Sequence, residues 1–295
     1  MARSSTGEAR GGPRRGGAVP YTLLAPGMIW LVLFFMIPIW YLLQTALSIS
    51  DATGNTTFVW RWANFADSWS LYHAQYLRSF EYALAATLLC IVIGYPLAYF
   101  IAFRGGRFQS LLLGLVVVPF FTSYLVRTLA WKTILQDDGP FVRMLRAVHV
   151  LGPNGRLLST SVAVIGGLTY NFLPFMVLPI YVSLEKIDLR LVDAGKDLYS
   201  SPLRAFRKIV LPLSIPGVLA GSLLTFIPAA GDFVNSALLG SPQTRMIGNV
   251  VQGNFLETLD YPSAAAISFV LMAIILVMVL VYTRALGTDE LGGGL

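Results

Sequence analysis

The chain has 295 residues, of which 56% are hydrophobic and only 12% are charged. This charge content is about half that of soluble proteins, and long stretches carry almost no charge, which excludes an ordinary soluble domain. The formal net charge is +6, but the Lys and Arg residues lie in short segments beside apolar runs. Membrane topology explains this distribution better than nucleic-acid binding does. The sequence therefore predicts an integral membrane protein.

Few residues are suited to redox or metal chemistry. The single cysteine, Cys90, lies within an apolar run and has no second cysteine to pair with. His73 and His149 are far apart and have no cluster of ligands nearby, so we expect no metal site. No serine–histidine pair falls within facing apolar runs, which disfavours an intramembrane protease.

The chain begins with residues 1–19, which are rich in Gly, Ser and Arg and predict a disordered cytoplasmic tail. Arg14 and Arg15 resemble a twin-arginine export signal, but the apolar run that follows is too long for a signal peptide core. Apolar runs of the length that crosses a bilayer, about 20 residues, predict six transmembrane helices, at 21–47, 80–103, 110–134, 162–184, 213–231 and 264–283.

The arginines of the first tail place the N-terminus inside the cell. Alternation then places the connection around Arg104 and Arg107, the segment 185–213 and the C-terminal tail 285–295 inside as well. The outer connections are 49–79, 135–161 and 232–263. Their aromatic residues fit a belt at the membrane interface, or short helices lying on the membrane: Trp60, Trp62, Trp69, Tyr72, Tyr76 and Tyr261.

Prolines are expected to interrupt five of the six spans, and broken helices favour a transporter over a receptor or an anchor. Gly217 and Gly221 form a G-x-x-x-G spacing, which predicts close packing of two helices. The prolines are Pro26, Pro38, Pro96, Pro119, Pro174, Pro179, Pro216 and Pro228.

The segment 185–213 is charged and amphipathic, and it lies between two apolar spans. Asp188 is placed to cap a helix whose apolar stripe would contain Leu191, Ala194 or Gly195, and Leu198. After a turn at 199–201, Ser201 and Pro202 give a second helix-start signal.

This second helix would carry Leu203, Phe206 and Val210 on one side, and the sequence Leu211-Pro212 would end it. The other side would be basic, with Arg204, Arg207 and Lys208. A hairpin of this kind is either a docking surface for another protein or an interfacial structure that meets anionic lipid.

Residues of this segment resemble the cytoplasmic motif of binding-protein-dependent ABC importer permeases, which reads E-A-A, three residues, G, nine residues, I-x-L-P. The matching residues are Asp193-Ala194-Gly195, Tyr199, Ile209 and Leu211-Pro212, with Asp, Gly and Tyr standing where the motif has Glu, Ala and Gly. The resemblance implies that the segment is a coupling helix seated on an ATPase subunit. The implied contact residues are Asp193, Ala194, Gly195, Lys196, Leu198, Tyr199, Ser200, Ser201, Pro202, Ile209, Leu211 and Pro212.

Four further stretches, 95–99, 118–131, 226–234 and 246–249, are similar to the spermidine/putrescine permease subunits of that family. The resemblance covers about residues 21–282. It implies the type I importer fold, with one six-helix permease domain at 20–284, N-in and C-in, in the bacterial plasma membrane.

The implied partners are a second homologous permease, two copies of an ATPase subunit and an extracytoplasmic solute-binding protein. The sequence contains no G-x-x-x-x-G-K-[ST] phosphate-binding loop. The chain would therefore not be an enzyme, and ATP and Mg²⁺ would be bound by the partner ATPase. A polyamine is the implied cargo, and another small solute is the alternative within the family.

Two charges fall near the outer ends of spans, Arg127 in the third and Asp232 after the fifth. Because an ionised side chain within a bilayer costs about 2.5 to 3.5 kcal/mol, each needs water or a partner. They would either neutralise each other, or line a pathway in which Asp232, Tyr124 and Trp131 attract an ammonium cargo. A secondary transporter or channel remains a different hypothesis, which would need no ATPase docking surface.

Overall fold

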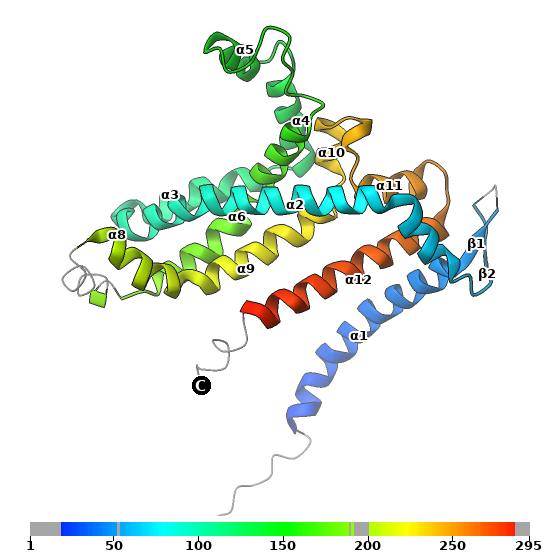
Figure 1. The fold of residues 1–295 in the computed structure, drawn as a ribbon. Coiled ribbons are helices and arrows are strands. Elements are labelled where there is room, and N and C mark those ends of the chain that lie inside the picture. The colour runs from blue at the N-terminus through cyan, green and yellow to red at the C-terminus, as the bar shows by residue number, and fades with distance from the viewer. Residues whose placement is uncertain (1–18, 52–53, 189, 192–200, 287–295) are drawn as a thin grey trace, which may run out of the picture.

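The computed structural model describes residues 19–51, 54–188, 190–191 and 201–286, so most of both tails lies outside the described residues (Figure 1). The long helices are α1 (Val19–Ala46), α2 (Ala63–Arg104), α6 (Ser161–Glu185), α9 (Leu211–Ala230) and α12 (Tyr261–Leu286). The shorter elements are β1 (Ser48–Ser50), β2 (Thr56–Phe58), η1 (Gly106–Phe108), α3 (Gln109–Val117), η2 (Val118–Phe121), α4 (Tyr124–Leu135), α5 (Pro140–Ala147), α8 (Pro202–Ala205), η3 (Phe206–Val210), α10 (Val234–Leu239), η4 (Pro242–Thr244) and α11 (Ile247–Leu256).

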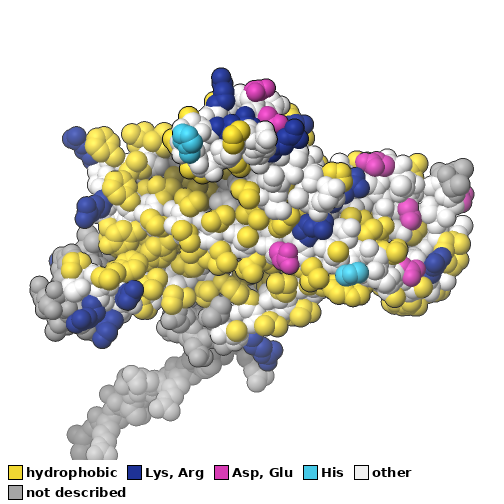
Figure 2. All heavy atoms as spheres, turned by 45° about the horizontal axis from the view of Figure 1, so that its top comes forward, with side chains coloured by type: hydrophobic (Ala, Val, Ile, Leu, Met, Phe, Trp, Pro, Cys, Tyr) yellow, Lys and Arg dark blue, Asp and Glu magenta, His cyan; other side chains and the backbone are white. Residues whose placement is uncertain are grey.

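The described part of the chain contains five helices that are long and apolar enough to cross a membrane, and a bent pair of helices that makes a sixth span. This agrees with the six spans expected from the apolar runs. Figure 2 shows the hydrophobic surface along the bundle, with Lys and Arg side chains gathered at the end that carries the 185–213 segment. The exposed residues there include Arg104, Arg107 and Arg204.

The second span is longer than the apolar run at 80–103, because α2 is a helix of 42 residues that begins at Ala63. Its first part was expected to belong to an outer connection, with its aromatic residues in an interfacial belt or on short helices lying on the membrane. Tyr76 is instead fully buried, and its hydroxyl donates to the carbonyl of Ile267 in α12 at 2.9 Å. The expectation was wrong for Tyr76 because packing against α12 takes this ring out of the solvent.

The third span is broken. The first half leads from α3 into η2 and ends at Phe121, and the second half starts with α4 at Tyr124. The two halves meet at an angle of 94°. Pro119 lies in the 3₁₀ turn η2, and Thr122 is extended with φ −79° and ψ 147°. Proline removes a backbone donor at this point, which favours a break over a continuous helix.

The other prolines do not break their spans, contrary to the expectation of five interrupted helices. α1, α2, α6 and α9 each run continuously through the prolines they contain. In a helix bundle, neighbouring helices can satisfy the backbone carbonyls that a proline leaves without a donor, so the helix need not end there. The prolines are Pro26 and Pro38, Pro96, Pro174 and Pro179, and Pro216 and Pro228.

A two-stranded antiparallel hairpin, β1–β2, lies in the outer connection before α2, with Ser48 opposite Phe58. The sequence analysis did not predict these strands, which are only three residues each. The side chain of Asn64 donates to the carbonyls of Ala46 and Ser48 at 2.8 and 2.9 Å. The hairpin is thereby fixed to the start of α2.

The core of the bundle is formed by α2, α6 and α9, which lie side by side (Figure 1). Gly217 and Gly221 of α9 face α6. A Cβ atom on Gly217 would lie 2.5 Å from the carbonyl oxygen of Pro179, and one on Gly221 would lie 3.1 Å from that of Met176. The close helix packing predicted from the G-x-x-x-G spacing is confirmed.

Substituting Gly217 by alanine is expected to destabilise the protein by about 1 to 3 kcal/mol, because the added methyl group collides with backbone rather than with a movable side chain. The measurement is the midpoint of thermal unfolding in detergent. Gly166 of α6 is the matched control, since a Cβ there meets nothing within 4 Å. Unfolding midpoints of Gly217→Ala and Gly166→Ala that rise together would contradict the packing.

Candidate functional site

The 185–213 segment connects α6 to α9 at one end of the bundle (Figure 1). At its start, Asp188 Oδ1 accepts a hydrogen bond from the backbone N–H of Arg190 at 2.9 Å, the contact expected of a capping carboxylate. Of the expected contact residues, the structure places Ser201, Pro202, Ile209, Leu211 and Pro212. The others lie outside the described residues: Asp193, Ala194, Gly195, Lys196, Leu198, Tyr199 and Ser200.

Ser201 is extended and Pro202 occupies the first position of α8, as the Ser-Pro pair predicts. The expected helix end at Leu211-Pro212 is wrong. The π-helical turn η3 leads directly from α8 into α9, so that 202–230 forms one helix of 29 residues. Pro212 follows the π turn, where the regular hydrogen-bond pattern is already interrupted.

Phe206 joins this helix to α2. Its ring meets the rings of Tyr95 and Tyr99 edge to face, with centroids 5.9 and 5.7 Å apart. The hydroxyls of Tyr95 and Ser214 are 2.7 Å apart, and Val210 is buried beside them. The part of the segment from 202 to 213 is therefore packed onto the transmembrane core.

Leu203 was expected on the same side as Phe206 and Val210; it is 59% exposed, whereas Val210 is buried. The basic residues Arg204, Arg207 and Lys208 are exposed, as predicted. The exposed surface of the segment thus combines these charges with Leu203.

A second group of polar residues lies where α4, α6 and α10 meet, and we call it the outer polar hub. The carboxylate of Asp232 accepts hydrogen bonds from the Tyr124 hydroxyl and from the backbone N–H of Asn235, the latter at 2.8 Å. The side chain of Asn235 donates to the Tyr124 hydroxyl at 2.6 Å, and that of Asn171 donates to Asn235 Oδ1 at 3.1 Å. Thr128 accepts from Asn171 at 3.3 Å.

The hub is buried. Thr128 and Asn235 have no exposed surface, Asn171 is 1% exposed and Asp232 is 8% exposed. Its geometry depends on α10, because the turn after α9 directs both Asp232 and Asn235 toward α4. Asn171 and Asn235 were missed by the sequence analysis, although an amide inside an apolar run is the signal that points to Asn171.

Arg127 is not paired with Asp232. The two ion pairs among the described residues join Arg61 to Asp67 and Arg156 to Asp137. The guanidinium of Arg127 lies over the ring of Phe120, 4.2 Å from its centroid, and 5.8 Å from that of Tyr124. In this conformation Arg127 and Asp232 therefore do not neutralise each other.

Trp131 lies apart from the hub contacts. Its ring meets that of Tyr170 edge to face at 5.3 Å, and it packs on the cluster of Leu135, Ala163 and Leu239. The structure thus brings together Tyr124 and Asp232, places Arg127 beside Tyr124, and puts Trp131 against another aromatic residue.

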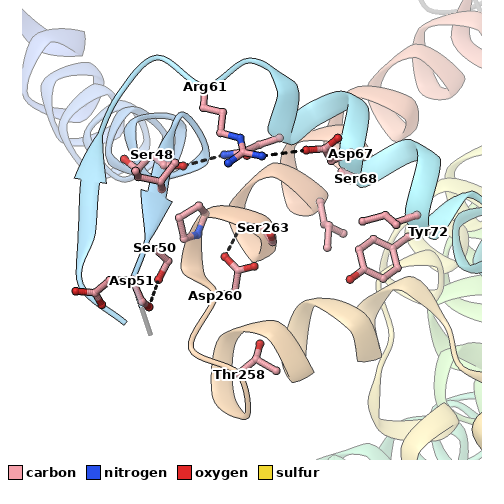
Figure 3. Close-up of a pocket in the computed structure, with 15 residues that line it drawn as sticks. Ser48, Ser50, Asp51, Arg61, Asp67, Ser68, Tyr72, Thr258, Asp260 and Ser263 are labelled. Atoms are coloured by element: carbon pink, nitrogen blue, oxygen red, sulfur yellow. Dashed lines mark hydrogen bonds and ion pairs between the residues drawn. The ribbon is translucent and has the colours of Figure 1, made fainter. Parts of the chain in front are cut away.

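A polar cavity of about 460 Å³ lies at the outer end, between the hairpin, the start of α2 and the start of α12 (Figure 3). At its rim, Arg61 and Asp67 form an ion pair of 3.6 Å. Asp260 accepts a hydrogen bond from the backbone N–H of Ser263 at 3.2 Å, and the Ser50 hydroxyl donates to the carbonyl of Leu259 at 3.4 Å. The contact between Ser50 and Leu259 joins the hairpin to the segment before α12.

The six candidate spans are those of a multi-pass membrane protein. The family model of the binding-protein-dependent transport system inner membrane component matches residues 91–285. The spermidine/putrescine transport system permease protein PotB of Escherichia coli (strain K12) is 40% identical over 257 residues, which are 87% of this chain and 94% of that protein. PotB of Haemophilus influenzae is 35% identical over the same share of this chain and 90% of its own.

A solved bacterial ABC transporter involved in the import of alginate has a similar fold, with a TM-score of 0.64 at 17% identity, covering 90% of this chain and 94% of that one. The chain belongs to the family of binding-protein-dependent transport system inner membrane components. It is the permease subunit of an ABC importer and a multi-pass protein of the bacterial inner membrane.

Proposed function

We propose that this permease imports a polyamine and forms half of a translocation pathway with a second homologous permease. The observation that carries the proposal is the 40% identity to a spermidine/putrescine permease, which extends over 87% of the chain. Cargo is received from an extracytoplasmic solute-binding protein and is an organic polycation. Asp232 and Tyr124 provide the carboxylate and the aromatic ring that such a cargo would meet at the outer end.

ATP hydrolysis is assigned to two copies of a partner ATPase, which bind ATP and Mg²⁺. The 185–213 segment is the surface on which one copy docks, and residues 193–202 with 209–212 form the contact. The packing of Phe206 on Tyr95 and Tyr99 supports this assignment, because it gives movement of the segment a direct route into α2. The pathway residues are Asp232, Tyr124, Arg127 and Trp131.

The complete complex, reconstituted in proteoliposomes with the binding protein outside and ATP inside, is expected to take up labelled spermidine. Uptake should stop without ATP and continue when ion gradients are collapsed. ATP-independent uptake that falls with an ion gradient would instead identify a secondary transporter. Absence of uptake for spermidine and putrescine, with ATPase activity stimulated by a different loaded binding protein, would identify another cargo.

Deletion of residues 199–202 is expected to abolish co-purification of the ATPase, because it removes the turn between the two predicted helices of the segment. The second permease should still co-purify from the same membranes, which controls for folding. An ATPase that remains bound to the deletion variant would contradict the docking role of the segment.

A further inference from the structure

Arg127 has buried hydrogen-bond donors that nothing satisfies. Its Nε and Nη1 atoms are inaccessible to solvent and have no hydrogen-bond partner. The guanidinium is held only by aromatic faces, at 4.2 Å from Phe120 and 5.8 Å from Tyr124. Buried donors without an acceptor are costly, and these two atoms call for a physical explanation.

Nε and Nη1 are covered in the conformation described, so a rearrangement is needed before an acceptor can reach them. Within the described residues, the hub carboxylate is the acceptor that such a rearrangement could bring to them. Tyr124 connects Arg127 to one carboxylate, that of Asp232, because its ring lies beside the guanidinium and its hydroxyl donates to Asp232. The carboxylate of Asp137 is already paired with Arg156 at 3.1 Å.

The backbone provides a place for the rearrangement. Thr122 and Ser123 are extended and separate η2 from α4, and the helix axes turn by 94° there. Phe120 lies before this break, whereas Tyr124 and Arg127 lie after it. Rotation of α4 about the break would consequently move Arg127 off Phe120 without bending a helix.

We infer that Arg127 and Asp232 form an ion pair in a second state of the transport cycle, in which the guanidinium replaces the Tyr124 hydroxyl on the carboxylate. The inference rests on the proposed function, since it assumes a cycle with two conformations. In the state described here, Tyr124 and Asn235 hold Asp232, and Phe120 holds Arg127. In the second state the two charges satisfy each other and close the outer end.

In one state Asp232 is hydrogen-bonded and Arg127 lies on aromatic rings, and in the other the two charges pair, so the arrangement is a two-position switch. The populations of the two states depend on which group binds Asp232, the Tyr124 hydroxyl or the Arg127 guanidinium. Removing the Tyr124 hydroxyl should favour the ion pair, whereas removing either charge should prevent it. The proposal therefore predicts opposite shifts for substitutions of neighbouring residues.

The first test uses the complete complex in proteoliposomes and four variants: Arg127→Gln, Asp232→Asn, Arg127→Asp, and the double variant Arg127→Asp/Asp232→Arg. Each single substitution is expected to lower ATP-driven uptake about tenfold or more, because it leaves the other charge unpaired. The charge-exchanged double variant should recover most of the lost uptake. Losses that multiply in the double variant would overturn the ion pair.

The second test measures the distance between spin labels at Leu129→Cys on α4 and Ala237→Cys on α10, both exposed positions, with Cys90 replaced by alanine. The distance distribution should change between the nucleotide-free and the vanadate-trapped complex. Tyr124→Phe should shift the nucleotide-free distribution toward the trapped one, and Arg127→Gln should abolish the change. A change that persists in Arg127→Gln would overturn the inference.

These outcomes are separable from failure of the proposed function. A complex that does not bind the ATPase, or does not hydrolyse ATP when the loaded binding protein is added, contradicts the proposed function. A complex that assembles and transports, but in which charge exchange restores nothing, contradicts only the switch.

Discussion

Replacing Phe206 by alanine is expected to lower ATP-driven uptake about tenfold, while the ATPase subunit remains bound to the complex. The ring is the contact that joins the 185–213 segment to Tyr95 and Tyr99 of α2. Without it, movement of the segment no longer displaces α2 by the same amount. The measurement is uptake per ATP hydrolysed in proteoliposomes, compared with the amount of ATPase that co-purifies.

Leu203→Ala is the matched control, because Leu203 belongs to the same short helix and is 59% exposed. Its uptake per ATP should match that of the unsubstituted protein. Phe206→Tyr keeps the ring and should retain most of the coupling. Equal losses in Phe206→Ala and Leu203→Ala, or normal coupling in Phe206→Ala, would show that the aromatic contact does not transmit the movement.

The largest expected effect on stability is that of Asn235→Leu. Asn235 is fully buried, and its side chain is bonded to Tyr124, to Asn171 and to Asp232. Leucine would leave these groups with fewer partners in a buried site. Because each unsatisfied buried polar group costs about 1 to 3 kcal/mol, the expected loss is about 3 kcal/mol or more.

Thermal unfolding in detergent measures this loss, with Ala237→Leu on the exposed side of the same helix as the control. Asn235→Asp keeps the acceptor toward Asn171 but adds a charge beside Asp232, so it should also be destabilising. An unfolding midpoint of Asn235→Leu that equals the control would mean that the hub carries no stability.

The positions of the spans followed from apolar runs, since a bilayer requires about 20 apolar residues whatever the tertiary structure. The start of α2 could not be predicted from the apolar runs. Residues 63–79 carry Arg78 and His73, and their helix is stabilised by packing against α11 and α12 rather than by lipid. The hydrophobicity of a segment indicates whether it would lie in water or in lipid. It says little about whether a helix distant in sequence packs against it.

The breaks in helices show the same limit. Eight prolines looked equivalent in the apolar runs, yet only Pro119 coincides with a break within the described residues. The sequence predicted only part of the outer polar hub. Asp232 and Tyr124 were selected for their chemistry, and the structure contains the hydrogen bond between them. Asn235 was overlooked because its role depends on the turn after α9, which carries no periodic signal.

The continuous helix 202–230 also sets a condition on chain length. Phe206 near one end and Asp232 just beyond the other are separated by a fixed number of helical residues. Each residue of a helix adds about 100° of rotation, so one inserted residue would turn Asp232 away from α4 while Phe206 kept its place. If the 185–213 segment is exchanged between related permeases, the number of residues from Phe206 to Gly231 must therefore stay the same, even where the sequences differ.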